Sequence, residues 1–198
     1  MANLREEKTV VIVKPDGVKR GLVGEIIRRI EQRGLKIIAL EMFQATPKQM
    51  DAHYPKDREW ITNLGRNTAR SYEEYKISTT LTEDYGTEDL FEIGVMVRKW
   101  LIDFMASGPL VKMVVSGLHA IAMVRKIVGP TIPSFAEMGT LRGDFSVDSP
   151  ALANVQRRAV HNLAHASGNP EEAAHELSIW FTPKEVHDYK RAEEDIMF

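Results

Sequence analysis

The first fifty residues alternate between strand-like and helix-like patterns of apolar positions. Residues 9–13 form a β-branched run that predicts a buried strand, and a Lys-Pro-Asp-Gly turn at 14–17 ends it. Residues 22–30 place leucine and isoleucine at helical spacing, and a glycine ends that pattern. Residues 35–43 predict a second strand, and the Thr-Pro pair at 46–47 marks the start of another short helix.

The middle of the chain is predicted to be helical. One block runs from about Trp60 to Tyr75 and a second from Leu90 to Met105, and the polar residues 78–87 join them. The apolar positions of the second block are Leu90, Ile93, Val97, Trp100, Leu101 and Phe104. Such a stripe suits packing onto a sheet, packing across a subunit contact, or closing as a lid over a ligand.

The C-terminal half returns to alternating elements. Residues 109–115 predict a third strand, 120–128 a helix and 129–148 a long loop with glycine and proline. A fourth strand is expected at 157–164 and a closing helix at 170–180. The order β-α-β-β-α-β predicts an α+β fold of the ferredoxin-like sandwich type, with helices on one face of an antiparallel four-stranded sheet.

Composition limits the classes of function. At 198 residues and 43% hydrophobic content, we expect one domain with one well-buried core. The formal net charge of −2 gives no overall attraction to nucleic acid or to an anionic membrane, so an anion site would depend on local cations. The absence of cysteine excludes disulfides and thiolate zinc sites. The N-terminus is polar and no apolar run approaches roughly 18 residues, so we expect a soluble cytoplasmic protein.

A histidine stands just ahead of a well-marked helix start. Asn169 is a good N-cap, Pro170 suits the first helical position, and Glu172 follows three residues after the cap. His165 therefore precedes a helix N-terminus, where unpaired backbone N–H groups and the helix dipole favour anions. A phosphoryl group arriving at an imidazole, or leaving it, would suit this position.

Four motifs occur together in one order along the chain. They lie at residues 13–27, 139–145, 162–167 and 176–181. Together they closely resemble nucleoside diphosphate kinases, whose members pass the γ-phosphate of a nucleoside triphosphate to an active-site histidine and then to a nucleoside diphosphate. That reaction is a ping-pong phosphoryl transfer.

The resemblance runs from residue 9 to residue 189 and leaves two segments that look inserted. These segments are about 56–98 and 146–157. The resemblance implies a single nucleoside diphosphate kinase domain over 1–198 that carries both insertions. It also implies a homo-oligomer, with a hexamer built from dimers as the family expectation.

The resemblance assigns catalytic roles to five residues. His165 is the nucleophile, since an unperturbed imidazole is largely neutral at pH 7 and can attack without a separate base. Glu176 corresponds to the residue that accepts a hydrogen bond from the other ring nitrogen and fixes the tautomer. Ser167 is expected to hydrogen-bond Glu176 or to steady the loop. Tyr54 corresponds to a tyrosine close to the histidine, and Lys14 to a catalytic lysine.

Phosphate and sugar contacts follow from the same resemblance. Lys14, Arg125 and Arg142 correspond to the cations that neutralise charge on the transferred phosphoryl group. Thr131 corresponds to a hydroxyl that hydrogen-bonds phosphate. Asn162 and Lys14 correspond to groups that reach the ribose 3′-hydroxyl.

The base contacts allow two alignments. The family holds the base between an aromatic ring and an aliphatic side chain, and such stacking tolerates any base. Counting forward from residues 56–58 assigns the ring to Trp60, whereas counting backward from 107–109 puts Val97 in that place and Leu101 at the aliphatic one. We favour Trp60 with Leu101. The chain also departs from the family at 168–169, where glycine and asparagine replace the acidic residue and serine of many relatives.

Mg²⁺ is the expected cofactor. It should arrive with the nucleotide and bridge phosphate oxygens, because no cluster of three or more acidic side chains marks a dedicated protein site. The expected partners are nucleoside di- and triphosphates, with ATP as the usual donor and without nucleic acid or membrane. His161 and His165 are four residues apart, but no third ligand stands at suitable spacing, so we expect no protein-held metal.

Two other functions remain open on the sequence alone. A ferredoxin-like module could keep the nucleotide pocket and lack the reaction, since fold does not fix function. The presence of His165, Lys14 and Glu176 together argues against it. The same fold can bind nucleic acid, but residues 110–115 carry no aromatic pair and the net charge is slightly acidic.

Overall fold

The computed structural model describes residues 6–192 and 194–197. These residues divide into two compact units, which we describe in turn. The first unit comprises residues 6–44, 109–146 and 162–197 apart from 193, and the second comprises Ala45–Gly108 and Val147–His161. Both segments expected to be insertions fall almost wholly within the second unit.

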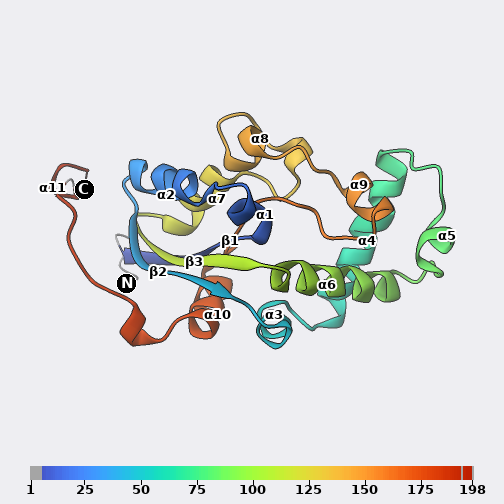
Figure 1. The fold of residues 1–198 in the computed structure, drawn as a ribbon, viewed down its shortest axis with the longest axis horizontal. Coiled ribbons are helices and arrows are strands. Elements are labelled where there is room, and N and C mark those ends of the chain that lie inside the picture. Colours follow the sequence, from blue (N-terminus) through green and yellow to red (C-terminus); the bar gives the residue numbers. More distant parts are fainter. Residues whose placement is uncertain (1–5, 193, 198) are drawn as a thin grey trace. The chain divides into compact units, whose positions relative to one another are not determined.

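The first unit contains a sheet and the helices around it (Figure 1). Its elements are β1 (Glu7–Val13), α1 (Pro15–Lys19), α2 (Val23–Gln32), β2 (Lys36–Gln44), β3 (Pro109–Gly117), α7 (Ala120–Val128), η2 (Pro133–Phe135), α8 (Leu141–Phe145), β4 (Ala164–Ala166), α10 (Pro170–Trp180), η3 (Pro183–Glu185) and α11 (Glu194–Met197). The order β1-α2-β2-β3-α7-β4 is the predicted one.

The four strands form an antiparallel sheet in the order β2-β3-β1-β4. β1 lies between β3 and β4, with Val11 opposite Met113 on one side and Ile12 opposite His165 on the other. This arrangement confirms the predicted α+β, ferredoxin-like fold. It also brings the ends of β1 and β4 together, so residues 14–17 lie beside the segment that precedes His165.

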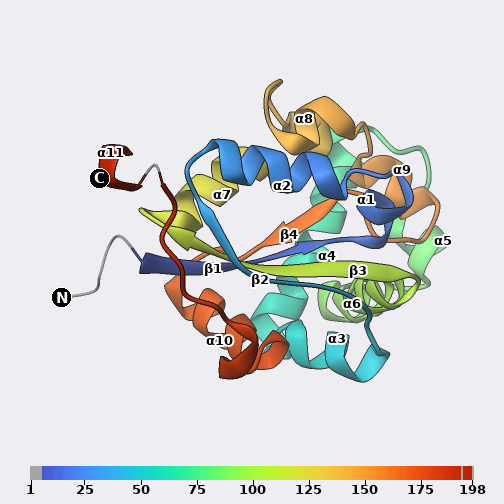
Figure 2. The ribbon, with the colours of Figure 1, turned by 60° about the vertical axis from the view of Figure 1, so that its left-hand side comes forward.

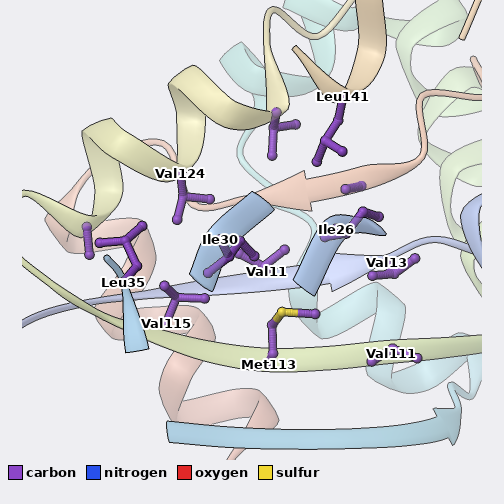
Figure 3. Close-up of a cluster of buried hydrophobic side chains, with 13 residues drawn as sticks. Val11, Val13, Ile26, Ile30, Leu35, Val111, Met113, Val115, Val124 and Leu141 are labelled. Atoms are coloured by element: carbon purple, nitrogen blue, oxygen red, sulfur yellow. The ribbon is translucent and has the colours of Figure 1, made fainter. Parts of the chain in front are cut away.

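The main core lies between one face of the sheet and the helices α2 and α7 (Figure 3). Alternate residues of β1 and β3 meet apolar residues of α2 and α7 that are three or four positions apart, as strand and helix periodicity require. Its buried members include Val11, Val13, Ile26, Ile30, Val111, Met113, Val115, Val124 and Leu141. The predicted helical face at Ile26 and Ile30 is thus the one that packs.

The other face of the sheet is covered as well. Val10 and Ile12 point to that side and are fully buried, and α10 packs there against β1 (Figure 2). Lys112 on the same face donates a 2.5 Å hydrogen bond to the Trp180 carbonyl at the end of α10. The expectation of helices on one face therefore needs a correction. α10 occupies the second face, and this is the helix that follows His165.

The fourth strand lies later in the chain than predicted. β4 is Ala164–Ala166, whereas the sequence suggested 157–164. Residues before it cannot extend, because Arg157 adopts a positive φ of 51° and the backbone N–H of His161 donates to the Asp148 carboxylate. His165 is consequently a member of the strand and does not follow it. The expected loop at 129–148 also contains the short helices η2 and α8.

The second unit is helical and contains α3 (Pro47–His53), α4 (Arg58–Glu74), α5 (Leu81–Tyr85), α6 (Leu90–Ala106) and α9 (Pro150–Val155). α4 and α6 correspond to the two predicted helical blocks. Thr46 caps α3 through its hydroxyl, which accepts a hydrogen bond from the Gln49 N–H. α5 was not predicted, since its five residues lie in the polar segment 78–87 that joins the two helical blocks.

α4 and α6 cross closely because each has a glycine at the crossing. A Cβ atom on Gly65 would lie 1.9 Å from the carbonyl oxygen of Leu90, and a Cβ atom on Gly94 would lie 1.9 Å from that of Ile61. No larger residue fits at either position without moving a helix. These contacts fix the first half of α4, which carries Trp60, relative to the first turns of α6.

Among the residues that the structure describes, no helix has both the length and the apolar character needed to cross a bilayer.

Candidate active site

His165 takes part in a chain of contacts between β4, α10 and β1. Its Nε2 atom lies 2.6 Å from Oε1 of Glu176, a carboxylate that is only 2% exposed. The other oxygen of Glu176 accepts a 2.7 Å hydrogen bond from the Ser167 hydroxyl. The Ser167 oxygen in turn accepts a 3.1 Å hydrogen bond from the backbone N–H of Val10. Strand β1 therefore fixes the Glu176 carboxylate through Ser167, and the carboxylate fixes the orientation of the His165 ring.

Helix periodicity explains how Glu176 reaches the ring. α10 begins as predicted, with Asn169 accepting a 2.7 Å hydrogen bond from the Glu172 N–H and with proline at the first helical position. The buried residues of α10 are Ala173, Glu176 and Trp180, which are three and four positions apart. Glu176 thus lies on the face that packs against the sheet.

The backbone just before His165 is held in an unusual conformation. Leu163 has a φ of +70°, in the left-handed region that a leucine rarely adopts, and it is 1% exposed. Its carbonyl accepts a 2.8 Å hydrogen bond from the Lys14 N–H, and its own N–H donates to Oδ2 of Asp16 at 3.0 Å. Such strain costs about 1–3 kcal/mol and persists only where the surroundings impose it. Here the start of α1 imposes it and so sets the direction of β4.

Lys14 and Asn162 form a polar pair beside the strand end. Lys14 Nζ donates a 2.7 Å hydrogen bond to Oδ1 of Asn162, and the Asn162 amide donates to the Thr131 carbonyl at 2.8 Å. Burial of Lys14 and the charge of Arg142 lower the pKa of the Lys14 ammonium to about 8, and the Asp16 carboxylate opposes this shift. Lys14 thus remains mainly protonated near neutral pH.

Arg142 lies on α8 and donates hydrogen bonds to three backbone carbonyls. Its guanidinium donates to the carbonyl oxygens of Asn162 at 3.0 Å, Gly129 at 2.7 Å and Ala164 at 2.6 Å. Burial and the charge of Arg125 lower the pKa of Arg142 to about 10, so it stays charged at neutral pH. A guanidinium has five N–H donors, and these three bonds leave two for a phosphate.

Arg125 lies on the outer side of α7, since the buried face of that helix is formed by Ile121, Val124 and Val128. Its Nη1 atom lies 3.6 Å from the point where a Cβ atom of Gly168 would stand. Arg125 therefore reaches the loop that follows His165. A cavity of about 730 Å³ has Arg125, Gly168 and residues of the 129–140 loop in its lining, whereas His165, Lys14 and Arg142 do not line it.

The imidazole is electrostatically suited to act as a nucleophile. Desolvation of the ring and the charges of Lys14, Arg142 and Arg125 hold the pKa of His165 well below its ordinary value, and the Glu172 carboxylate opposes this shift. The ring is therefore neutral at pH 7. A carboxylate oxygen 2.6 Å from Nε2 favours the tautomer protonated there, which leaves the lone pair on Nδ1. The arrangement can accept an electrophilic phosphorus atom among three cations.

Comparisons with known proteins decide the family. A family model described as nucleoside diphosphate kinase matches residues 7–62 and 95–186. The nucleoside diphosphate kinase of Pyrobaculum aerophilum is 47% identical over 180 residues, which are 91% of this chain and 97% of the relative. That of Archaeoglobus fulgidus is 35% identical over 192 residues, 97% of each chain. The chain belongs to the nucleoside diphosphate kinase family.

Solved structures agree with this conclusion. The crystal structure of the Pyrobaculum aerophilum NDP kinase matches with a TM-score of 0.89 at 45% identity, covering 92% of this chain and all of the other. The nucleoside-diphosphate kinase of Borrelia burgdorferi, solved as a transition-state mimic with bound vanadate and ADP, matches with a TM-score of 0.76 at 33% identity, covering 97% and 96%. The protein is a nucleoside diphosphate kinase that transfers phosphate between nucleoside tri- and diphosphates. The family model leaves residues 63–94 unmatched, within the expected first insertion.

The first unit of this nucleoside diphosphate kinase brings together most of the residues expected at the site. They are Lys14, Arg125, Thr131, Arg142, Asn162, His165, Ser167 and Glu176. Thr131 is exposed, and its contact with the group is the hydrogen bond that its carbonyl accepts from Asn162.

The remaining expected residues lie in the second unit. Tyr54 ends α3, and its carbonyl accepts a 3.0 Å hydrogen bond from Arg98. Its ring lies 6.1 Å from that of Trp60 on the first turn of α4. Val97 packs instead with the buried cluster around Tyr72, Tyr85 and Ile93. Leu101 is half-buried on α6, one turn after Val97. Because Val97 packs in that cluster while the Trp60 ring lies beside Tyr54, Trp60 is the better candidate for the contact with the base.

Two acidic residues were not singled out as site residues from the sequence. Asp16 lies in the predicted turn, yet its carboxylate binds the Leu163 N–H and its charge acts on both Lys14 and Arg142. Glu172 was predicted to belong to the helix start alone, yet its charge acts on His165. The sequence signal was the position of Asp16 within the motif at 13–27 and of Glu172 between the motifs at 162–167 and 176–181.

Proposed function

We propose that His165 carries the phosphoryl group between the two halves of a ping-pong exchange. The observation that supports this most directly is the contact of the buried Glu176 carboxylate with Nε2 of the ring, which favours the tautomer whose lone pair is on Nδ1. In the first half, the Nδ1 lone pair forms a bond to the γ-phosphorus. The bond from that phosphorus to the bridging oxygen breaks, and its electron pair leaves with the nucleoside diphosphate.

The second half reverses the first with another nucleotide. An oxygen of the terminal phosphate of a nucleoside diphosphate attacks the phosphorus, and the electron pair of the N–P bond returns to Nδ1. The Glu176 carboxylate lies 2.6 Å from Nε2, so it stabilises the positive charge that the ring carries while phosphorylated. Ser167 keeps the carboxylate in place through its 2.7 Å hydrogen bond.

The cations have separate tasks in this proposal. Arg125 and the two remaining donors of Arg142 bind the phosphoryl oxygens, where negative charge is spread in the transition state. Lys14 contacts phosphate as a point charge and, together with Asn162, meets the ribose 3′-hydroxyl. The 2.7 Å hydrogen bond between Lys14 and Asn162 supports this pairing, because one hydroxyl could contact both. Thr131 donates its hydroxyl to a phosphate oxygen.

Mg²⁺ fits this site as a companion of the nucleotide. The Glu176 carboxylate already contacts Ser167 and His165, and the Glu172 carboxylate accepts the Gly168 N–H. Besides these two carboxylates, the charges that act on the ring are those of Lys14, Arg142 and Arg125, which suit phosphate oxygens and not a metal ion. When bound with the nucleotide, Mg²⁺ would neutralise part of the negative charge of its phosphates.

Residues of the second unit complete the proposal. Tyr54 orients His165 or meets the transferred phosphoryl group, and Trp60 and Leu101 hold the base between them. Stacking of this kind predicts broad acceptance of purine and pyrimidine nucleotides, with ATP as the usual donor. We further propose one nucleoside diphosphate kinase domain with insertions at 56–98 and 146–157. We also propose that the protein assembles into a homo-oligomer, which in the family is a hexamer, and that it is located in the cytoplasm.

Half-reactions test the proposal. The enzyme is incubated with ATP, freed of nucleotide by rapid gel filtration, and then given GDP alone. Formation of GTP under these conditions, together with parallel lines in double-reciprocal initial-rate plots, is the expected result. If GTP forms only while ATP is present, the two nucleotides react directly in a ternary complex and the proposal fails. Nucleotide binding without any transfer would identify a silent module.

A further inference from the structure

Glu172 does not make the contact that its place in the helix start predicts. In a capping box, the side chain three residues after the cap accepts a hydrogen bond from the backbone N–H of the cap residue. Asn169 completes its half by accepting the Glu172 N–H at 2.7 Å. The Glu172 carboxylate instead reaches one residue further back, where Oε2 accepts the Gly168 N–H at 2.8 Å. Its side chain is therefore directed at the loop that follows His165.

The carboxylate fills the space that Gly168 leaves open. A Cβ atom on Gly168 would lie 2.6 Å from Oε2 of Glu172, closer than carbon atoms approach such an oxygen. Nη1 of Arg125 lies 3.6 Å from the same point. Negative charge from the first turn of α10 therefore occupies the position beside Gly168.

The charge of Glu172 also acts on the catalytic ring. Three cations lower the pKa of His165, and Glu172 is the carboxylate that opposes them. The side chain is half-buried and tied to the Gly168 N–H, so its charge is fixed near the site and not averaged over solvent. A fixed negative charge near the exposed Arg125 guanidinium favours particular orientations of that side chain, and such preorganisation reduces the reorganisation that a reaction requires.

We infer that Glu172 is a positioning residue that supplies negative charge beside Gly168 from the first turn of α10. Its carboxylate holds the loop after His165 and orients the Arg125 guanidinium for the phosphoryl group in transit. The inference rests on the function proposed above for His165 and Arg125. It concerns orientation, because Glu172 itself contacts neither nucleotide nor the reacting atoms.

Glu172→Gln tests the charge with the hydrogen-bond acceptor retained. We expect kcat for ATP-dependent phosphorylation of the enzyme to fall roughly tenfold, less than the loss of a direct transition-state donor costs. The KM for ATP should stay unchanged or decrease, because the variant removes negative charge beside a site for a polyanion. Damage to the structure alone would raise KM. The matched control is Glu171→Gln, which removes the same charge from the same helical turn at an exposed position.

A second-site variant tests whether negative charge at this position, and not the Glu172 side chain as such, is what the site requires. Glu172→Ala should be at least as slow as Glu172→Gln, and adding Gly168→Asp to it should restore kcat to within roughly threefold of the wild type. The inference is overturned if Glu172→Gln matches Glu171→Gln, or if the double variant stays as slow as Glu172→Ala. Failure of the proposed function looks different, because the wild-type enzyme itself would then form no phosphohistidine.

Discussion

The hydroxyl of Ser167 and the carboxylate of Glu176 are joined by a 2.7 Å hydrogen bond at a site where both side chains are buried. The same carboxylate contacts Nε2 of His165 at 2.6 Å. One oxygen of the buried Glu176 carboxylate is therefore bonded to Ser167 beside the sheet, and the other oxygen contacts the His165 ring. This relation links the fold to the chemistry, because the strand pairing that forms the core also sets the orientation of the nucleophile.

Glu176→Ala should slow phosphorylation of the enzyme about 10–100-fold, as loss of an orienting carboxylate commonly does. The ring would then lose the partner that fixes its tautomer, while nucleotide binding would stay nearly normal. Ser167→Ala should have a smaller effect in the same direction, since it removes one support of the carboxylate. Rapid-quench single turnovers measure both. Full activity of Glu176→Ala would mean that another group orients His165.

Activity should decline in mildly alkaline solution. The pKa of Lys14 is about 8, so the ammonium loses its proton as the pH rises through that value. The kcat/KM for ATP reports the free enzyme and should fall over the same range. In Lys14→Arg the guanidinium stays charged, so the decline should disappear even though the overall rate is lower. A decline that persists unchanged in Lys14→Arg would assign it to another group.

Arg142→Lys should destabilise the protein as well as slow it. A lysine cannot reproduce the fork that donates to three backbone carbonyls, and buried acceptors left without donors cost about 1–3 kcal/mol each. We expect the free energy of unfolding in urea to fall by about 2–4 kcal/mol. Arg28→Lys is the control, because Arg28 is an exposed partner of Glu25 and such pairs contribute about 0–1 kcal/mol. Equal stability of the two variants would contradict the structural role of Arg142.

Gly17→Ala should disturb the active site from a distance. Its Cβ atom would lie 2.8 Å from the carbonyl oxygen of Leu163, and the strained turn before His165 would have to move. Gly24→Ala is the matched control, because no atom lies within 4 Å of the new Cβ and alanine favours a helix. We expect lower kcat and lower thermal stability for the first variant only. If both variants behave alike, the contact between α1 and Leu163 does not constrain the site.

Much of the fold follows from local pattern. The helix at 120–128 and the helix at 170–180 have the predicted bounds, because amphipathic spacing and the Asn-Pro start are local signals. The fourth strand was misplaced, since its limits depend on the contact of Asp148 with His161 and on the left-handed Leu163, which no periodicity reveals. The position of α10 on the second sheet face also depends on tertiary packing.

The site was predictable to a different extent. Its cations could be identified only through the resemblance, because single arginines and lysines carry no distinguishing local pattern, whereas the helix start after His165 already indicated an anion site there. The pattern around Glu172 was explained by helix capping, so the sequence did not predict its contact with Gly168. Asp16 was concealed in the same way by its place in a turn. The motifs thus identified Glu176 and Ser167, which orient the ring, but not Asp16 and Glu172, whose contacts have a local explanation.

Identification of the phosphorylated atom tests the central claim most directly. The enzyme is incubated with γ-labelled ATP, and the label is located by peptide mapping and by its stability in acid and alkali. The account predicts one acid-labile, alkali-stable phosphoryl group on His165, and none in His165→Ala although nucleotide still binds. A label on another residue, or undiminished labelling of His165→Ala, would contradict it.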